Sequence, residues 1–468
     1  MFQSASEQAS RPRVETLIPI SDDWRATEAV VTPIQGAERP VVWALAAIVG
    51  VSTAIFLFVV VAGFVRQPYS DMFDFIRAEF DLERSGDFAA YLASTHNHQH
   101  LIWVRILTAL DIKVFHGSTI VFLAAAALSI MVAALTVAGE IWRLTSVRMV
   151  GALAGALAVM LVASTVNAMD CTQPINSVYA IAFVFAVLAI ILFERAGEDA
   201  ARHAVLLASL ALTAGLAAVA GSAAGVAVFP ALALSAVRNP GARRLIAPVL
   251  VVALASMAVV GAALAGAAPV QSAGAGPGHL WKMADYFVVY AGMPWSAVKV
   301  LSRLRLALGL ITIVLGAALF WRGSKRLGAA GRLERIGLDL IAFSLITAAM
   351  AAVGRVDENE AVVVPVRYAV FMSAFQVGAI CVLAPALAER WASLKRYAVP
   401  GALATAVALL GQQAAAGSSV LRTSQYIRNE ITAFQAGARR PEMRQLIHPD
   451  FNVATQVEAE CRKRGLYQ

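Results

Sequence analysis

The sequence contains few charged residues. Asp, Glu, Lys and Arg make up 15% of its 468 residues, whereas hydrophobic residues make up 59%. A soluble protein of this size carries roughly 25% charged residues. Several apolar runs reach the ~20 residues that a helix needs to cross a bilayer, and no long stretch alternates apolar and polar residues as membrane β-strands do. We therefore predict an all-α, polytopic helical membrane protein.

The motifs of several soluble enzyme classes are also absent. The sequence has no Walker A loop, no GxGxxG after a strand, no DxD motif and no GxSxG nucleophile elbow. Its three cysteines lack CxxC spacing, so a metal–thiolate site is not predicted. The net charge of +8 comes from Lys and Arg in short loops without a base-stacking motif, so nucleic acid is not a predicted partner.

Apolar runs of sufficient length predict about eleven transmembrane helices. These runs lie near residues 41–65, 118–139, 150–168, 175–193, 203–219, 222–237, 245–267, 298–320, 336–353, 365–386 and 398–415. Three parts follow from this pattern, namely a disordered cytoplasmic tail at 1–40, a transmembrane domain at 41–415 that includes an outward loop at 66–117, and a small periplasmic tail at 416–468.

Basic residues mark alternate connections between the predicted spans. The segments "EIWRLTSVR", "RNPGARR", "WRGSKRLGAAGRLER" and "ERWASLKR" are rich in Lys and Arg, which places them in the cytoplasm. This orientation requires two helices within 203–237 that turn at Gly221-Ser222, because both ends of that segment are basic. One long tilted helix there would reverse every later assignment. We predict a multi-pass protein of the bacterial inner membrane, with its N-terminus in the cytoplasm and its C-terminus in the periplasm.

The first outward loop opens with acidic residues at the end of the first span. In "YSDMFDFIRAEFDLERSG", apolar residues recur at helical spacing and predict an amphipathic helix on the membrane surface. Asp71 and Asp74 lie on a neighbouring polar face, and we predict that they are functional. The alternative is a solvated face on which Asp74 pairs with Arg77. For Asp81 and Glu83 we predict a solvated face without a functional role.

Histidines follow in the same loop, in "THNHQH". His96 and His100 would share a face of a helix, which is a spacing that can bind zinc, but no third ligand is evident and HExxH is absent. We favour His98 and His100 as ligands of a sugar or phosphate; a structural cluster is about equally favoured, and a divalent metal stays an open alternative. Residues 101–115 predict a second surface helix, on which Arg105 is a candidate for substrate binding.

Two later outward loops carry further polar residues. "GRVDENEAVVVPVRY" supplies Arg355, Arg367 and Tyr368, and a guanidinium can bind phosphate through two parallel hydrogen bonds. Arg367 lies just inside a span, where a charge should have a partner. "NAMDCTQPINS" supplies Asp170 and Gln173 as additional candidates.

The predicted orientation places Cys171 and Cys461 in the same oxidising compartment. A disulfide between them is one alternative, and unpaired cysteines are the other.

The arrangement resembles the GT-C superfamily of integral-membrane glycosyltransferases. A first span is followed by an acid-bearing outward loop and then by many Ala-rich spans. A narrower resemblance, to a group of bacterial polytopic proteins, is carried by "HNHQH" with "ALDIKVFHG", by "GRVDENEAVVVPVRY" and by "IHPDFNVATQVEAECRKRGL". The sequence departs from that group at "NHQH", which lacks the Glu and Arg of the group's Asn-Glu-His-Arg stretch.

The superfamily resemblance implies a lipid-phosphate-linked sugar donor and an acidic catalytic residue early in the first outward loop, where Asp71 and Asp74 lie. We predict an inverting glycosyltransferase that transfers a sugar from a polyprenyl-phosphate donor to a cell-envelope glycan or lipid acceptor. An Asp would be the general base, and Arg355 and Arg367 would bind the phosphate. The alternatives are a transporter or flippase for a lipid-linked saccharide, and a non-catalytic subunit of a polysaccharide assembly complex.

Overall fold

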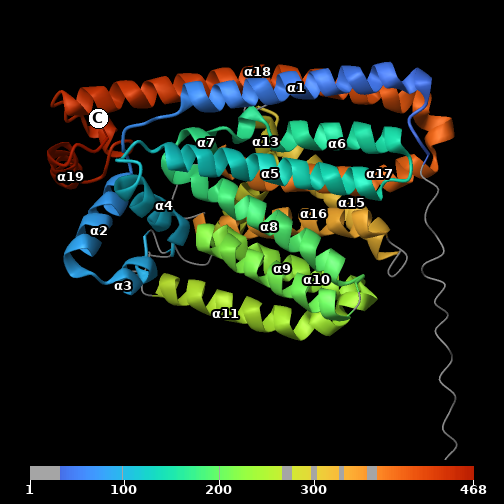
Figure 1. Ribbon diagram of the computed structural model, residues 1–468, viewed down its shortest axis with the longest axis horizontal. Coiled ribbons are helices and arrows are strands. Elements are labelled where there is room, and N and C mark those ends of the chain that lie inside the picture. The colour runs from blue at the N-terminus through green and yellow to red at the C-terminus, as the bar shows by residue number, and fades with distance from the viewer. Residues whose placement is uncertain are drawn as a thin grey trace, which may run out of the picture.

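The computed structural model describes residues 32–96, 99–199, 201–265, 277–296, 303–325, 331–355 and 366–467. These residues form helices and no extended strand. The long helices are α1 (Arg39–Gly63), α5 (Ile120–Leu144), α6 (Arg148–Val162), α8 (Ser177–Ala196), α9 (Ala201–Gly221), α10 (Val228–Arg238), α11 (Ile246–Ala265), α12 (Pro277–Ala291), α15 (Arg305–Ser324), α16 (Arg332–Arg355), α17 (Ala369–Glu389) and α18 (Trp391–Gln435). They run side by side as a bundle (Figure 1).

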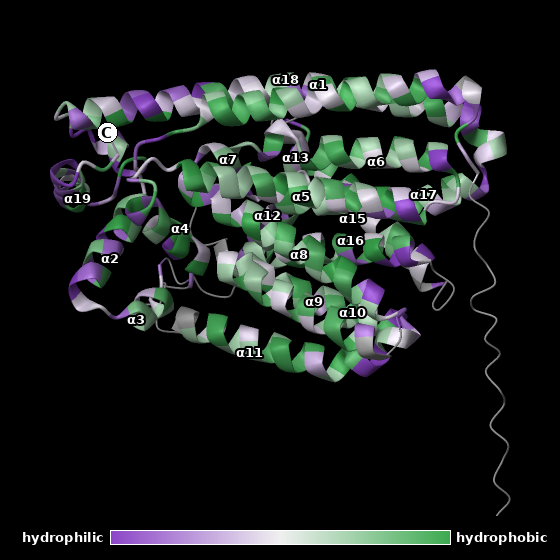
Figure 2. Ribbon diagram, viewed as in Figure 1, coloured by the Kyte–Doolittle hydropathy of each residue, from purple (hydrophilic) through white to green (hydrophobic). Residues whose placement is uncertain are grey.

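Ten helices within the described ranges are long and apolar enough to cross a membrane. A helix rises 1.5 Å per residue, so ~20 residues match the ~30 Å apolar core of a bilayer. Hydrophobic residues cover the lengths of the bundle helices, and hydrophilic residues gather at their ends (Figure 2). The architecture is that of a multi-pass helical membrane protein. The predicted span at 222–237 is covered by a shorter apolar helix, Ala223–Arg238, so the count of eleven stays a prediction.

The predicted turn at Gly221-Ser222 is confirmed. Helix α9 ends at Gly221, and the Ser222 hydroxyl accepts a hydrogen bond from the Ala224 N–H at 3.3 Å, which begins a short 3-10 helix, Ala223–Ala227. Helix α10 then runs back along the bundle (Figure 1). The chain therefore forms two helices at this point and not one long tilted helix.

The basic connections meet at one end of the bundle, as predicted. Buried Glu140 on α5 pairs with Arg195 at the end of α8, and Arg335 Nε on α16 lies 2.6 Å from Glu194 Oε2 on α8. Arg238 at the end of α10 pairs with the buried Asp339 on α16. Four helices that are far apart in the sequence are thereby joined at their charged ends.

Two parts of the chain differ from the sequence-based expectation. Helix α12 and the short α13 (Met293–Ser296) lie where a connection at 268–297 was expected, and Tyr290 of α12 is fully buried. Helix α18 continues through residue 415 to Gln435, a length of 45 residues. It packs along α1, where Gly417 allows close approach because a Cβ there would lie 2.8 Å from Val59. The end of α18 therefore projects beyond the bundle.

The other end of the bundle carries a cap, which we define as residues 64–96, 99–119 and 436–467. The cap contains α2 (Met72–Ser85), α3 (Phe88–Ala93), α4 (Ile102–Lys113) and α19 (Phe451–Lys463) (Figure 1). The two predicted amphipathic helices of the first loop correspond to α2 and α4; their place at the membrane surface stays a prediction. The apolar face of α2, together with Tyr69 just before it, packs on residues 427–467, which we call the C-terminal segment. The cluster contains Tyr69, Phe73, Ile76, Phe80, Ile431, Phe434, Ile447 and Val457.

Candidate functional site

Asp71 and Asp74 lie at the first turn of α2. Asp71 is the N-cap residue and Asp74 is one turn later, so the two carboxylates share a face of the helix. The chain enters this turn through Ser70, whose φ of 53° is in the left-handed region that non-glycine residues rarely adopt. The Ser70 N–H donates to the Ile447 carbonyl at 2.5 Å. This contact holds the start of α2 against the C-terminal segment.

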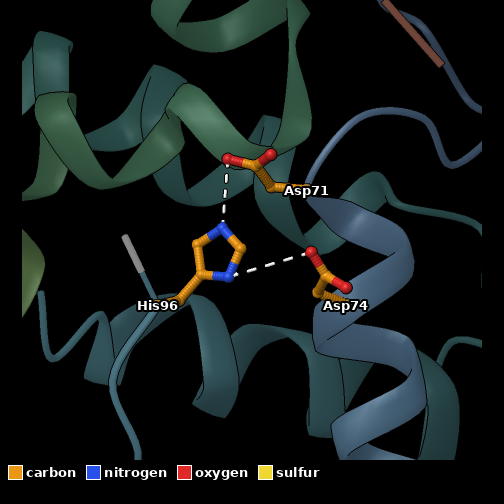
Figure 3. A group of neighbouring side chains, drawn as sticks. All are labelled: Asp71, Asp74 and His96. Atoms are coloured by element: carbon orange, nitrogen blue, oxygen red, sulfur yellow. Dashed lines mark ion pairs between the residues drawn. The ribbon is translucent and has the colours of Figure 1, made fainter. Parts of the chain in front are cut away.

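His96 lies between the two carboxylates. Its Nε2 is 3.1 Å from Asp71 Oδ2, and its Nδ1 is 3.9 Å from Asp74 Oδ2 (Figure 3). A pair of 2.9 Å backbone hydrogen bonds with Gln99 holds the backbone of His96, and its ring packs on Phe75 with ring centroids 4.8 Å apart. His96 therefore belongs to a loop and not to a helix, so the shared helical face expected for His96 and His100 is not formed. Asp74 pairs with histidine, and Arg77 is exposed.

His448 completes this cluster from the C-terminal segment. Its Nε2 lies 3.3 Å from Asp74 Oδ1, and its side chain is only 7% exposed. The backbone of Asp450 contacts its Nδ1 at 2.7 and 3.0 Å, which fixes the ring. His448 belongs to the "IHPD" segment, for which the sequence predicts no role. Its contact with Asp74 is evident only in the folded chain.

The environment of Asp71 favours the ionised carboxylate. Burial acts to raise its pKa, but the hydrogen bond and the charge of His96 lower it, and so do the charge of Arg367 and the Ser70 hydroxyl. The net effect places the pKa of Asp71 below its ordinary value. Asp71 is thus a carboxylate that can accept a hydrogen bond or a cation at neutral pH.

Arg367 brings a positive charge to the same end of the bundle. Its guanidinium carbon lies 5.9 Å from the ring centre of Tyr179 and 5.6 Å from that of Tyr368, and it is close enough to act electrostatically on Asp71, Asp170 and Tyr69. Its Nε has no hydrogen-bond acceptor within the described part of the chain. A buried donor without a protein acceptor is the usual position for a water molecule or a ligand.

Asp170 lies in the connection between α6 and α8, close enough to Arg367 for its charge to be felt. It is 1% exposed, and neither carboxylate oxygen accepts a hydrogen bond from any residue that the structure describes. Burial raises the pKa of Asp170 well above its ordinary value, although the charge of Arg367 opposes this effect. Asp71, Asp170, Arg367 and Tyr368 therefore lie in one region of the structure.

The remaining predicted site residues either stabilise the cap, lie elsewhere in the fold or fall outside the described residues. Arg105 is buried, with its guanidinium carbon 5.3 Å from the Phe75 ring centre and 5.2 Å from that of Tyr91, and it donates to the Ser94 carbonyl at 3.2 Å. It therefore supports the loop that carries His96. Gln173 accepts a hydrogen bond from Asn176 at 2.8 Å. His98 and the side chain of Arg355 lie outside the described residues.

His100 and Gln99 border a mostly apolar cavity of about 320 Å³. Helices α9 and α11 form its walls, through Leu216, Val219, Ala220, Ala255, Val259 and Val260. Gln99 also pairs with the backbone of His96, so the cavity adjoins the loop that carries the site histidine. Its lining fits an alkyl or isoprenoid chain better than a polar ligand.

The cysteine alternative is resolved by the structure. Cys171, Cys381 and Cys461 are buried free thiols, so a disulfide between Cys171 and Cys461 is not formed. Burial raises the pKa of the Cys461 thiol to about 12, which makes it a poor nucleophile.

Comparison with known proteins found no matching family profile, no matching curated protein and no matching solved structure. The site is therefore interpreted from its own residues.

Proposed function

We propose that the protein transfers a sugar from a polyprenyl-phosphate donor to a glycan or lipid acceptor at the outer face of the bacterial inner membrane. The observation that carries this proposal is the combination of two half-buried groups, the Asp71 carboxylate and the Arg367 cation, whose charge acts on Asp71. Such a pair supplies a proton acceptor and a phosphate-binding group within one region. Both lie at an end of a membrane bundle, where a lipid headgroup would lie.

The proposed reaction is a single displacement. Asp71 accepts the proton of an acceptor hydroxyl, whose oxygen attacks the anomeric carbon of the donor sugar as the bond to the phosphate oxygen breaks. Arg367 stabilises the negative charge that develops on the leaving lipid phosphate. Attack from the face opposite the phosphate inverts the configuration at the anomeric carbon. His96 and His448 hold the two carboxylates in place.

The apolar cavity supports a lipid-linked donor. Its walls come from α9 and α11, two helices that can cross a membrane, and its polar edge is formed by Gln99 and His100 of the cap. A lipid-linked donor needs an apolar path for its chain, and this cavity adjoins the loop that carries His96. A water-soluble nucleotide sugar would have no use for such a cavity.

The transporter alternative would be favoured by an interrupted helix, because transporters use such helices to bind substrates at mid-membrane. The segment "AVAGSAAGVAVFP" is a candidate for one. The break instead lies at the cap end, where the Ala223 N–H donates to the Gln99 side chain at 3.3 Å. It is a turn between two helices, so this segment gives no specific support for transport.

The proposal is tested with purified variants in lipid vesicles that contain a polyprenyl-phosphate sugar. We expect Asp71→Asn to lower the rate of transfer by about 10²–10⁴-fold, which is the usual contribution of a general base. Arg367→Gln should mainly raise the donor concentration needed for half-maximal rate. Asp81→Asn on the same helix is the matched control, because Asp81 pairs with Arg84 at the exposed surface. Full activity of Asp71→Asn would refute the base assignment.

A further inference from the structure

The cluster of Asp71, Asp74 and His96 has the donor atoms and spacing of a metal site. One ligand atom from each of these residues lies within 4.8 Å of the others. Donor atoms that bind one ion at about 2.0–2.2 Å are separated by roughly 3–3.5 Å, and Asp71 Oδ2 already lies 3.1 Å from His96 Nε2. Asp74 Oδ2 lies 3.9 Å from the other ring nitrogen, Nδ1, so Asp74 would have to move towards Asp71 for both carboxylates to bind one ion.

The ring of His96 lies between the two aspartates. Each ring nitrogen faces a different aspartate (Figure 3). Only one nitrogen can bind a given ion, so an ion would draw both carboxylates to the side of that nitrogen. Packing on Phe75 and the backbone pairing with Gln99 restrict the ring further.

His448 extends the set as a positioning residue. It approaches Asp74 Oδ1, whereas His96 approaches Oδ2, so the two histidines hold opposite oxygens of one carboxylate. The Asp450 backbone fixes the far side of the His448 ring. The loop that carries His96 and the segment that carries His448 thus contact the two carboxylates at the start of α2. A divalent cation would relieve the repulsion between these carboxylates.

We propose that Asp71, Asp74 and His96 bind a divalent transition-metal ion, with His448 positioning Asp74. Mixed imidazole and carboxylate ligands suit Zn²⁺, Mn²⁺ or Fe²⁺, whereas Mg²⁺ and Ca²⁺ prefer oxygen ligands alone. In the proposed reaction, the ion would bind the acceptor hydroxyl and make its proton easier to remove. The second oxygen of Asp71 would still accept that proton. Binding of the ion does not depend on the sugar-transfer proposal, because it is measured without substrate.

The test uses the full-length protein, purified through a tag without histidine, saturated with Zn²⁺ and dialysed. We expect about one ion per chain in the wild type, and a loss of at least about fivefold in Asp74→Asn and in His96→Ala. His448→Ala should weaken the affinity by about 10–100-fold without abolishing binding. Asp81→Asn and His203→Ala are controls that should keep the ion, since both residues lie at exposed ion pairs elsewhere.

Loading the wild type with Co²⁺ gives a second readout that does not require a variant to fold. A visible absorption band of bound Co²⁺ that Zn²⁺ displaces supports the site. Absence of stoichiometric Zn²⁺ and of this band in the wild type would overturn the inference, and so would full metal content in a folded His96→Ala variant. Sugar transfer that persists in metal-free protein would refute the role of the ion but leave the proposed function standing.

Discussion

Asp71 and Asp74 are three residues apart at the start of α2, and this spacing alone places their carboxylates on one face. The sequence could therefore predict this part of the site. The contribution of His448 could not be predicted, because its contact with Asp74 depends on how the C-terminal segment packs on α2. Arg105 illustrates the opposite case. The sequence offered a charged residue in the right loop, but its burial between Phe75 and Tyr91 gives it a supporting role.

A single residue, Asp111, also predicts how the stability of the protein depends on pH. It is fully buried, its Oδ1 accepts the Thr119 N–H at 2.8 Å, and burial raises its pKa from 3.8 to about 6. Between about pH 4 and pH 6 the folded state binds more protons at this position than the unfolded state. The contribution of Asp111 to the free energy of unfolding therefore falls as the pH rises through this range and is constant above it.

Thermal unfolding of the wild type and of Asp111→Asn at a series of pH values measures this contribution. We expect the difference between their midpoints to shift in favour of the variant from pH 4 to pH 6 and then to stay constant. Asp81→Asn, at an exposed ion pair, should follow the wild type. Parallel curves for the wild type and Asp111→Asn would contradict the raised pKa.

At the scale of elements, apolar periodicity predicted α2 and the long spans well. It did not predict α12, because that segment has only 15 residues and carries Lys282 and Asp285 within "PGHLWKMADYFVVYA". It also did not predict the full length of α18. Hydropathy falls after residue 415, but Val420, Ile427, Ile431 and Phe434 continue a buried helical stripe. This stripe packs on α1 and on the cap, so it is formed by tertiary contacts that a hydropathy window does not detect.

The packing of α18 on α1 is tested by paired glycine substitutions. We expect Gly417→Leu to lower the free energy of unfolding by about 1–3 kcal/mol, because the added side chain meets Val59 of α1. Gly411→Leu on the same helix is the matched control, since nothing lies within 4 Å of a Cβ at that position. The control should be unchanged or more stable by about 1 kcal/mol, since leucine favours helix more than glycine does. Equal destabilisation of both variants would contradict the observed contact.

At the scale of the whole molecule, the alternation of basic connections predicted which loops lie together. The ion pairs of Glu140, Glu194 and Asp339 confirm that the basic connections meet at one end. The cap, which carries Asp71 and Asp74, lies at the other end (Figure 1). The sequence could predict which loops lie at the same end, because the number of basic residues in a loop does not depend on how the loops pack. The shape of the site could not be predicted, because it depends on contacts between loops.

Labelling of engineered cysteines with a membrane-impermeant thiol reagent tests which end faces outward. We expect Ser85→Cys and Gln445→Cys in the cap to react in intact cells, and Arg243→Cys in a basic connection to react only after permeabilisation. All three positions are exposed, whereas the native cysteines are at most 2% exposed and should give little background. Labelling of Arg243→Cys in intact cells together with protection of the cap positions would reverse the orientation.

The proposed function requires that this site cleave the bond between a sugar and a lipid phosphate. The most direct measurement follows a polyprenyl-phosphate sugar labelled on both its sugar and its phosphate, in vesicles that contain the wild-type protein and an acceptor. We expect the two labels to separate, with free polyprenyl phosphate released and the sugar joined to the acceptor in inverted anomeric configuration. Passage of the doubly labelled donor across the bilayer without cleavage would refute the proposed function and indicate a transporter.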